Sequence, residues 1–65
     1  MGEKIRAYLK SHGIKQTFLA EQTGLSISVI SDICLGNRKV SVEEYKKICD
    51  ALGVLLDYFF ENETD

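Results

Sequence analysis

Three side chains of this 65-residue chain could ligate a metal ion: Cys34, Cys49 and the single histidine, His12. Zinc sites in small domains are built from closely spaced cysteine and histidine ligands. The spacing of Cys34 and Cys49 matches no such pattern. We therefore expect both thiols to be reduced and buried, because free cysteine packs as a small hydrophobe. A disulfide or a metal site is the less favoured alternative.

The sequence offers little for catalysis. It has one histidine, no paired carboxylates in a pocket-forming context and no glycine-rich loop that could cradle a phosphate. A chain of this length is also too short to enclose a substrate readily. We expect no enzyme activity, no catalytic residue and no cofactor.

Charge is distributed unevenly along the chain. The net charge is -2, yet all eight Lys and Arg residues lie within residues 1–47, where only five of the ten acids occur. Residues 48–65 carry the other five acids and no base. Attraction to nucleic-acid phosphates depends on the local face rather than on the total charge. The charge pattern therefore neither favours nor excludes a nucleic-acid partner.

Composition favours one small helical domain over residues 1–65. Hydrophobic residues make up 45% of the chain and proline is absent. No apolar run approaches the ~20 residues that cross a bilayer, and the N-terminus lacks a signal-peptide core. We expect a cytoplasmic protein with no membrane contact and no ligand-binding domain.

Apolar residues recur at helical spacing in several segments, and glycines punctuate them. Ile5, Tyr8, Leu9 and His12 follow an i, i+3, i+4, i+7 pattern. A serine and a glutamate three residues apart, Ser41 and Glu44, form a capping-box pattern. We expect helices at about residues 2–12, 16–23, 27–35, 41–52 and 55–60, followed by an acidic tail at 61–65.

The second and third of these helices are separated by a short turn at Gly24. Ser26 is placed to cap the third helix with its side chain. Five apolar residues are placed to face one core: Leu19, Ala20, Leu25, Ile30 and Ile33. A helix held rigidly against another through a tight turn is typical of proteins that present the second helix to the DNA major groove.

The chain resembles the lambda-repressor-like family, the Cro and phage-repressor (XRE) type of helix-turn-helix domain. The resemblance covers about residues 3 to 60 and is carried by an ordered set at the family's spacings: Gly13, Ile14, Gln16, Leu19, Ala20, Thr23, Gly24, Leu25, Ser26, Val29, Ile30, Ser31, Gly36, Asn37, Arg38, Ser41, Ile48, Ala51, Leu52, Gly53 and Val54. It implies a compact all-α, five-helix domain that binds double-stranded DNA.

The resemblance also implies roles for particular residues. Helix 27–35 would be the recognition helix, with Ile27, Ser28 and Asp32 facing the bases. Gln16 would touch a phosphate or buttress the recognition helix, and the loop after that helix would hold backbone phosphates. The full candidate DNA-binding set is Lys15, Gln16, Ser26, Ile27, Ser28, Ser31, Asp32, Asn37, Arg38 and Lys39. The start of helix 16–23 lacks the family's capping box, so either Lys15 and free amides serve a phosphate or packing alone holds that helix.

Some positions depart from the family pattern. Leu9 and Cys34 replace a partly buried ion pair, so we expect these two side chains to touch in the core. Phe18 lies at a usually exposed position and receives no role. The recognition helix carries no Arg, Lys, Asn or Gln, which predicts modest affinity, with specificity drawn from dimer spacing and DNA shape.

The C-terminal helix is richer in apolar residues than one short helix can bury. We expect Leu56 and Phe59 to face the core and Leu55, Tyr58 and Phe60 to form a homodimer interface. Two recognition helices would then address half-sites roughly 34 Å apart. The sequence therefore predicts a transcriptional regulator, most simply a repressor on a palindromic operator. The alternative is a protein-interaction module on the same fold, such as an antitoxin-like partner or anti-repressor, with weak DNA binding.

Overall fold

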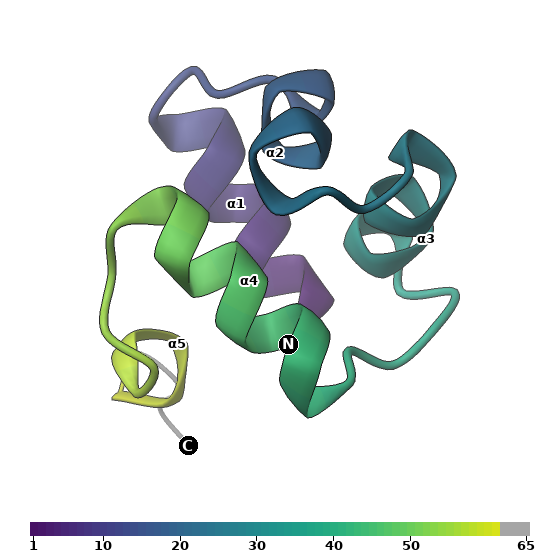
Figure 1. Cartoon of the computed structure of the whole chain (residues 1–65). Coiled ribbons are helices and arrows are strands. Elements are labelled where there is room, and N and C mark those ends of the chain that lie inside the picture. Colours follow the sequence, from purple (N-terminus) through teal and green to yellow (C-terminus); the bar gives the residue numbers. More distant parts are fainter. Residues whose placement is uncertain (62–65) are drawn as a thin grey trace.

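The computed structural model describes residues 1–61 and contains only helices as regular structure in that range. The helices are α1 (Gly2–Ser11), α2 (Gln16–Thr23), α3 (Ile27–Leu35), α4 (Val42–Leu52) and α5 (Tyr58–Glu61) (Figure 1). This arrangement confirms the prediction of an all-α fold with five helices.

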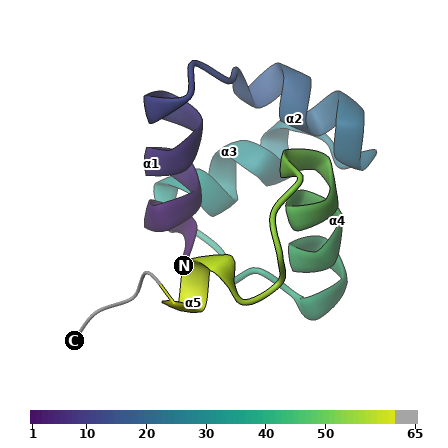
Figure 2. The same cartoon turned by 90° about the vertical axis from the view of Figure 1, so that its left-hand side faces the viewer.

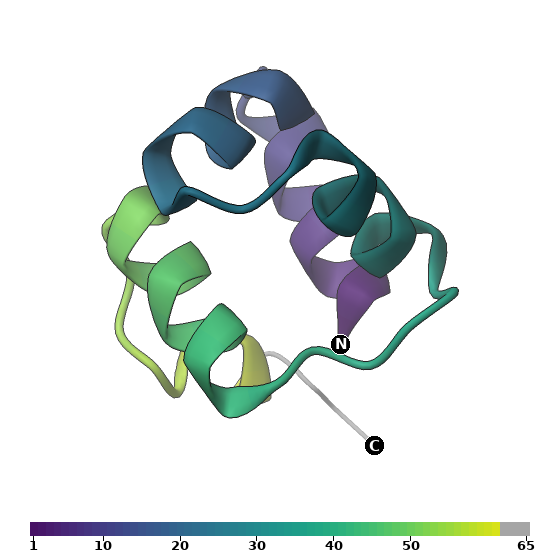
Figure 3. The same cartoon turned by 45° about the vertical axis from the view of Figure 1, so that its right-hand side comes forward.

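The helices pack around one core. α2 contacts both α3 and α4, and α1 contacts α3 (Figure 3). α5 lies between α1 and α4 in Figure 2, and its Phe59 ring contacts Tyr8 of α1 and Tyr45 of α4. The recognition-helix candidate α3 is thus supported by two helices that precede it in the chain.

Serine side chains define the starts of α3 and α4. The Ser26 hydroxyl accepts the Val29 N–H at 3.2 Å. Ser41 and Glu44 form a complete capping box, in which each side chain accepts the other residue's backbone N–H at 3.1 Å. Both predicted caps are confirmed. α2, by contrast, begins after Lys15 without any side-chain cap.

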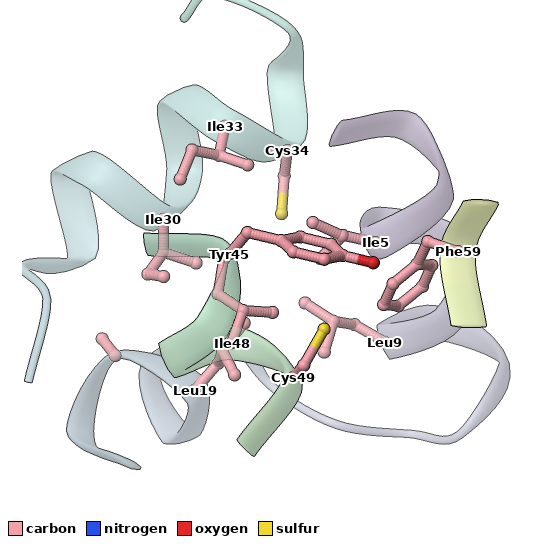
Figure 4. Close-up of a cluster of buried hydrophobic side chains, with 11 residues drawn as sticks. Ile5, Leu9, Leu19, Ile30, Ile33, Cys34, Tyr45, Ile48, Cys49 and Phe59 are labelled. Atoms are coloured by element: carbon pink, nitrogen blue, oxygen red, sulfur yellow. The ribbon is translucent and has the colours of Figure 1, made fainter. Parts of the chain in front are cut away.

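The core combines side chains from all five helices, with the Tyr45 ring near its middle (Figure 4). Its buried members are Ile5, Leu9, Leu19, Ala20, Ile30, Ile33, Cys34, Tyr45, Ile48, Cys49 and Phe59. Leu25, which was expected among them, is only partly buried against this cluster.

Both cysteines are free and buried, as predicted. Burial raises the pKa of the Cys34 thiol and of the Cys49 thiol, so both remain protonated and act as apolar core groups. Leu9 lies in the same cluster as Cys34, but direct contact between the two side chains stays a prediction.

The C-terminal end differs from the sequence-based expectation. α5 begins at Tyr58 rather than at Leu55, and Leu56 is 47% exposed rather than part of the core. The Leu56 carbonyl oxygen accepts the Tyr45 hydroxyl, and the Tyr58 N–H donates to the Leu55 carbonyl at 3.0 Å. These bonds hold a turn where a helix was expected, and they leave Phe59 as the buried anchor.

Smaller boundary shifts occur at two other helices. α1 ends at Ser11, and His12 follows it as the C-cap rather than as a helical residue. The His12 ring is exposed but stacks on Tyr8 with ring centroids 4.0 Å apart. α4 begins at Val42, since Ser41 is its cap.

Tyr45 makes stability sensitive to alkaline pH. Burial, followed by the neighbouring Cys49 thiol, raises the pKa of Tyr45 from 10.0 to about 12. Because the folded state holds the neutral phenol more tightly than the unfolded chain does, this stabilisation is complete below pH 10 and is lost as the pH rises through about 12.

The variant Tyr45→Phe isolates this effect. It should be less stable by about 1 kcal/mol at neutral pH, because the Leu56 carbonyl loses its donor. Its deficit should shrink between pH 10 and about 12, since it has no phenol to ionise. Urea unfolding of both proteins at a series of pH values measures the difference. A deficit that stays constant with pH would show that Tyr45 ionises equally in both states.

Candidate nucleic-acid interface

α3 is an amphipathic helix with one face in the core and one face in solvent. Ile30, Ile33 and Cys34 are buried. Ser28 and Asp32 are exposed on the opposite side, and Ile27, the first residue of the helix, is 43% exposed beside the buried face. Positions 28 and 32 are one helical turn apart and share a face. This solvent face offers a hydroxyl, a carboxylate and an apolar side chain, which can hydrogen-bond or contact base edges.

The turn before α3 is held by Thr23, whose role sequence reasoning missed. Thr23 is 9% exposed, and its hydroxyl donates to the Leu19 carbonyl at 2.8 Å. The same oxygen accepts the Leu25 N–H at 3.2 Å. Gly24 between them has φ +79, a left-handed conformation that favours glycine. The combination of a threonine that bonds back to its helix and a following glycine was the available signal.

Residues at the start of α2 lie outside the core. Lys15 is exposed at the N-cap position, and Gln16 is partly buried. The first amides of a helix have no partner within that helix, and here no side chain caps them. Such a helix end attracts anions through its free N–H groups and its dipole. The exposed Phe18 occurs on the same helix, and nothing in the structure assigns it a role.

The loop between α3 and α4 carries exposed polar and cationic side chains. Asn37, Arg38 and Lys39 are all exposed. The Asn37 N–H donates to the Asp32 carbonyl at 2.8 Å, which ties the loop to the last turn of α3. Ser31, also in the candidate set, is only partly exposed, and Ser26 is exposed but uses its hydroxyl as the α3 cap.

Arg38 forms an ion pair with Glu44 that was not foreseen from sequence. Its Nη2 donates to Glu44 Oε2 at 2.5 Å, and the two side chains are 40% and 15% exposed. The pKa of Glu44 lies below its usual value, chiefly because its carboxylate accepts the Ser41 backbone N–H, and further because of Arg38. Glu44 is therefore ionised at neutral pH and satisfies a helix cap and a loop cation at once.

Arg38 and Lys39 also border a groove on the side of the molecule where the N-terminus meets α5. Its apolar wall includes Val42, Leu56 and Phe60. The structure thus places the two loop cations next to Leu56 and Phe60, two exposed apolar residues near the C-terminal end of the described chain. Of the remaining candidates for DNA contact, Asn37 lies in the same loop, and the others lie on α3, at its N-cap or at the start of α2.

The expected interface residues differ in exposure. Leu55 is 77% exposed and Phe60 is 55% exposed. Tyr58 is partly buried and makes edge-on ring contacts with Tyr8 and Phe59. The exposed apolar surface also includes Val42 at 74%, which sequence reasoning did not select.

Within residues 1–61, no group of three or more His, Cys, Asp and Glu side chains could hold a metal ion. None of the helices in this range is both long enough and apolar enough to span a bilayer.

Comparison with known proteins adds a relationship by sequence. A helix-turn-helix family model matches residues 5–59. A protein of Bacillus subtilis (strain 168), described as the uncharacterized HTH-type transcriptional regulator YazB, is 34% identical over 56 residues. That match covers 86% of this chain and 81% of the relative. No solved structure shows significant similarity to the chain.

Proposed function

The chain belongs to the helix-turn-helix family of DNA-binding transcription regulators, and we propose that it acts as a repressor that binds a palindromic operator as a homodimer. This family is in general not enzymatic. The observation that carries the proposal is the solvent-facing side of α3, fixed in place by Ser26, Thr23 and its contacts with α1 and α2.

In the proposed complex, α3 enters the major groove of double-stranded DNA. Ile27 contacts a thymine methyl group, Ser28 contacts a base or phosphate, and Asp32 accepts from a cytosine amino group. The start of α2 and the loop residues Asn37, Arg38 and Lys39 contact backbone phosphates on either side. The cytoplasmic location expected from the sequence is consistent with a DNA partner.

The homodimer proposal rests on exposed apolar side chains near α5. Leu55 and Phe60 are largely exposed, and Phe60 also borders the groove next to Arg38 and Lys39. An apolar patch of this kind on a small domain is typical of an interface. Repression follows as the simplest activity, since a dimer that occupies a promoter blocks it without further contacts. Sedimentation equilibrium with and without operator DNA tests the dimer, and a strict monomer in both would reject it.

Selection of binding sites from a random duplex pool tests the function. A repressor of this design should enrich a palindrome with half-site centres about one DNA turn apart. Failure to bind any duplex would reject DNA binding and favour the alternative, a protein-interaction module. The observation that favours this alternative is that α3 carries no Arg, Lys, Asn or Gln, the side chains that make the strongest contacts with bases.

Lys39 should contribute to the salt dependence of DNA binding. Replacing Lys39 with alanine should reduce the slope of log affinity against log salt by about one, because one phosphate contact is lost. Lys10→Ala provides the control, since Lys10 is an exposed lysine in the last turn of α1 that is not among the candidate contacts. Fluorescence anisotropy with a labelled duplex over a salt series measures both slopes. Equal slopes for the two variants would remove Lys39 from the interface.

A further inference from the structure

We propose that Glu44 holds down the affinity of this protein for DNA by competing with backbone phosphate for the Arg38 guanidinium. The inference rests on the proposed function and assigns Glu44 a regulatory role beyond its helix cap. It concerns how strongly the α3–α4 loop binds phosphate, and not which bases α3 reads.

The carboxylate of Glu44 is fixed before any ligand arrives. Its Oε1 accepts the Ser41 N–H at 3.1 Å, and its own N–H donates to the Ser41 hydroxyl at 3.1 Å. The side chain is only 15% exposed. Because the capping box holds one carboxylate oxygen, the other oxygen, Oε2, is presented to the loop in a defined position. Arg38 Nη2 binds that oxygen at 2.5 Å.

The ion pair with Glu44 reduces the net positive charge that Arg38 can place beside a DNA phosphate. A cation releases counterions from DNA only when it places net positive charge beside a phosphate. With a carboxylate at 2.5 Å, the guanidinium must leave Glu44 or bring that negative charge toward the phosphate. Lys39, the next residue, has no such partner within residues 1–61 and keeps its full charge. The loop therefore carries two cations but only one that is unopposed.

The Arg38–Glu44 ion pair is weak enough for DNA phosphate to displace Glu44 from Arg38. Ion pairs between partly exposed side chains are modest, so a carboxylate of this kind alters affinity by about two- to fivefold rather than by orders of magnitude. Such a pair weakens every complex that uses the Arg38 phosphate contact, and random DNA sequences depend on phosphate contacts alone.

The variant Glu44→Gln separates the two roles of the residue. Glutamine can still accept the Ser41 N–H, because capping boxes use either residue, but it has no charge for Arg38. Thermal unfolding should confirm that the variant remains folded. Glu43→Gln is the matched control: it removes the same charge from the adjacent residue, which is exposed and forms no ion pair with a described residue.

The test measures anisotropy of a random-sequence duplex over a salt series. Glu44→Gln should bind about two- to fivefold more tightly than the wild-type chain and steepen the salt slope by up to about one. Glu43→Gln should change affinity less and leave the slope unchanged, since exposed charges away from the contact are screened. In an Arg38→Gln background, the effect of Glu44→Gln should disappear, because the two residues act as a pair.

Each other outcome has a distinct meaning. Equal behaviour of Glu44→Gln and Glu43→Gln, or an effect that persists without Arg38, would overturn the competition while leaving DNA binding intact. Weaker binding by Glu44→Gln would also overturn it, because Glu44 would then position Arg38 rather than restrain it. Absence of binding by every variant would overturn both this inference and the proposed function. Binding by Glu44→Gln alone would support the inference strongly.

Discussion

Replacing Phe59 with alanine should lower the free energy of unfolding by about 3–5 kcal/mol, the cost of removing a fully buried aromatic side chain. Phe59 is 2% exposed and is the buried member of α5 in the core. Its ring lies 5.8 Å from Tyr8, 6.3 Å from Tyr45 and 5.0 Å from Tyr58, measured between centroids. Tyr58 and Phe60 add ring contacts to Tyr8 and Tyr45, but among the described side chains of α5 only Phe59 belongs to the buried core.

The size of this loss is large relative to the whole domain. A domain of 65 residues is expected to have a total stability of roughly 3–10 kcal/mol. Phe59→Ala should therefore unfold an appreciable fraction of the protein at ambient temperature. Urea unfolding followed by circular dichroism provides the measurement. A loss under about 1 kcal/mol would show that α5 adds little to the core.

Phe60→Ala is the matched control for this prediction. It makes the same chemical change at the next residue, but Phe60 is 55% exposed and meets only Tyr45 among the described rings, at 5.5 Å. We expect a loss below about 1.5 kcal/mol, in proportion to its smaller burial. Measurements at two protein concentrations separate this loss from any effect on a dimer, because dissociation depends on concentration.

Helix positions could be predicted from the sequence because local chemistry determines them. Gly24 and Gly36 both adopt positive φ at the ends of helices, and Ser26 and Ser41 both cap the next helix. These signals act within a few residues and do not depend on the rest of the fold. The apolar periodicity likewise identified Ile5, Leu9, Leu19, Ile30 and Ile33 as core residues, and the burial of both cysteines was expected because free cysteine packs as a small hydrophobe.

The turn before α5 could not be predicted in the same way, because a distant residue determines it. The Leu56 carbonyl accepts the hydroxyl of Tyr45, eleven residues earlier. That bond stabilises a turn in a segment whose local pattern also suits a helix. Exposure of Leu56 follows from the turn, and it enlarges the apolar surface beyond the residues that were expected there.

The candidate site likewise combines features that follow from local sequence with one that depends on residues in different elements. Exposure of Ser28 and Asp32 follows from their spacing on α3, whereas Ile27 shares a side with buried Cys34 and is exposed because it is the first residue of the helix. The Arg38–Glu44 pair could not be inferred, because Glu44 already had a sufficient explanation as a capping residue. Two roles for one side chain become visible only when the loop and the helix are seen together.

After Phe59→Ala, the substitution Gly2→Ala should have the next large effect on stability. A Cβ atom on this residue would lie 2.0 Å from the carbonyl oxygen of Ile33 and 3.0 Å from its carbonyl carbon. Both are backbone atoms of α3, so they cannot rotate away as a flexible side chain would. Gly2→Ala must therefore push the start of α1 away from α3, and overpacking of this kind costs about 1–3 kcal/mol.

Helix propensity favours alanine over glycine at this position, but we expect this gain to be smaller than the steric cost. Alanine is favoured over glycine by at most about 1 kcal/mol inside a helix, and by less in the first turn. The displacement also disturbs buried neighbours, since Ile5 on α1 and Ile33 on α3 both belong to the core. We expect a net loss of about 1–2 kcal/mol, measured by urea unfolding.

Glu3→Ala distinguishes the steric effect from a general effect of alanine near the start of α1. Glu3 is exposed, so the substitution removes no core contact, and the loss of a favourable charge from the first turn costs only a few tenths of a kcal/mol. If Gly2→Ala proved as stable as Glu3→Ala, the close approach of α1 to α3 would not constrain the fold. A selective loss at Gly2 would mean that this contact helps to fix α3, the helix proposed to read DNA, through the backbone itself.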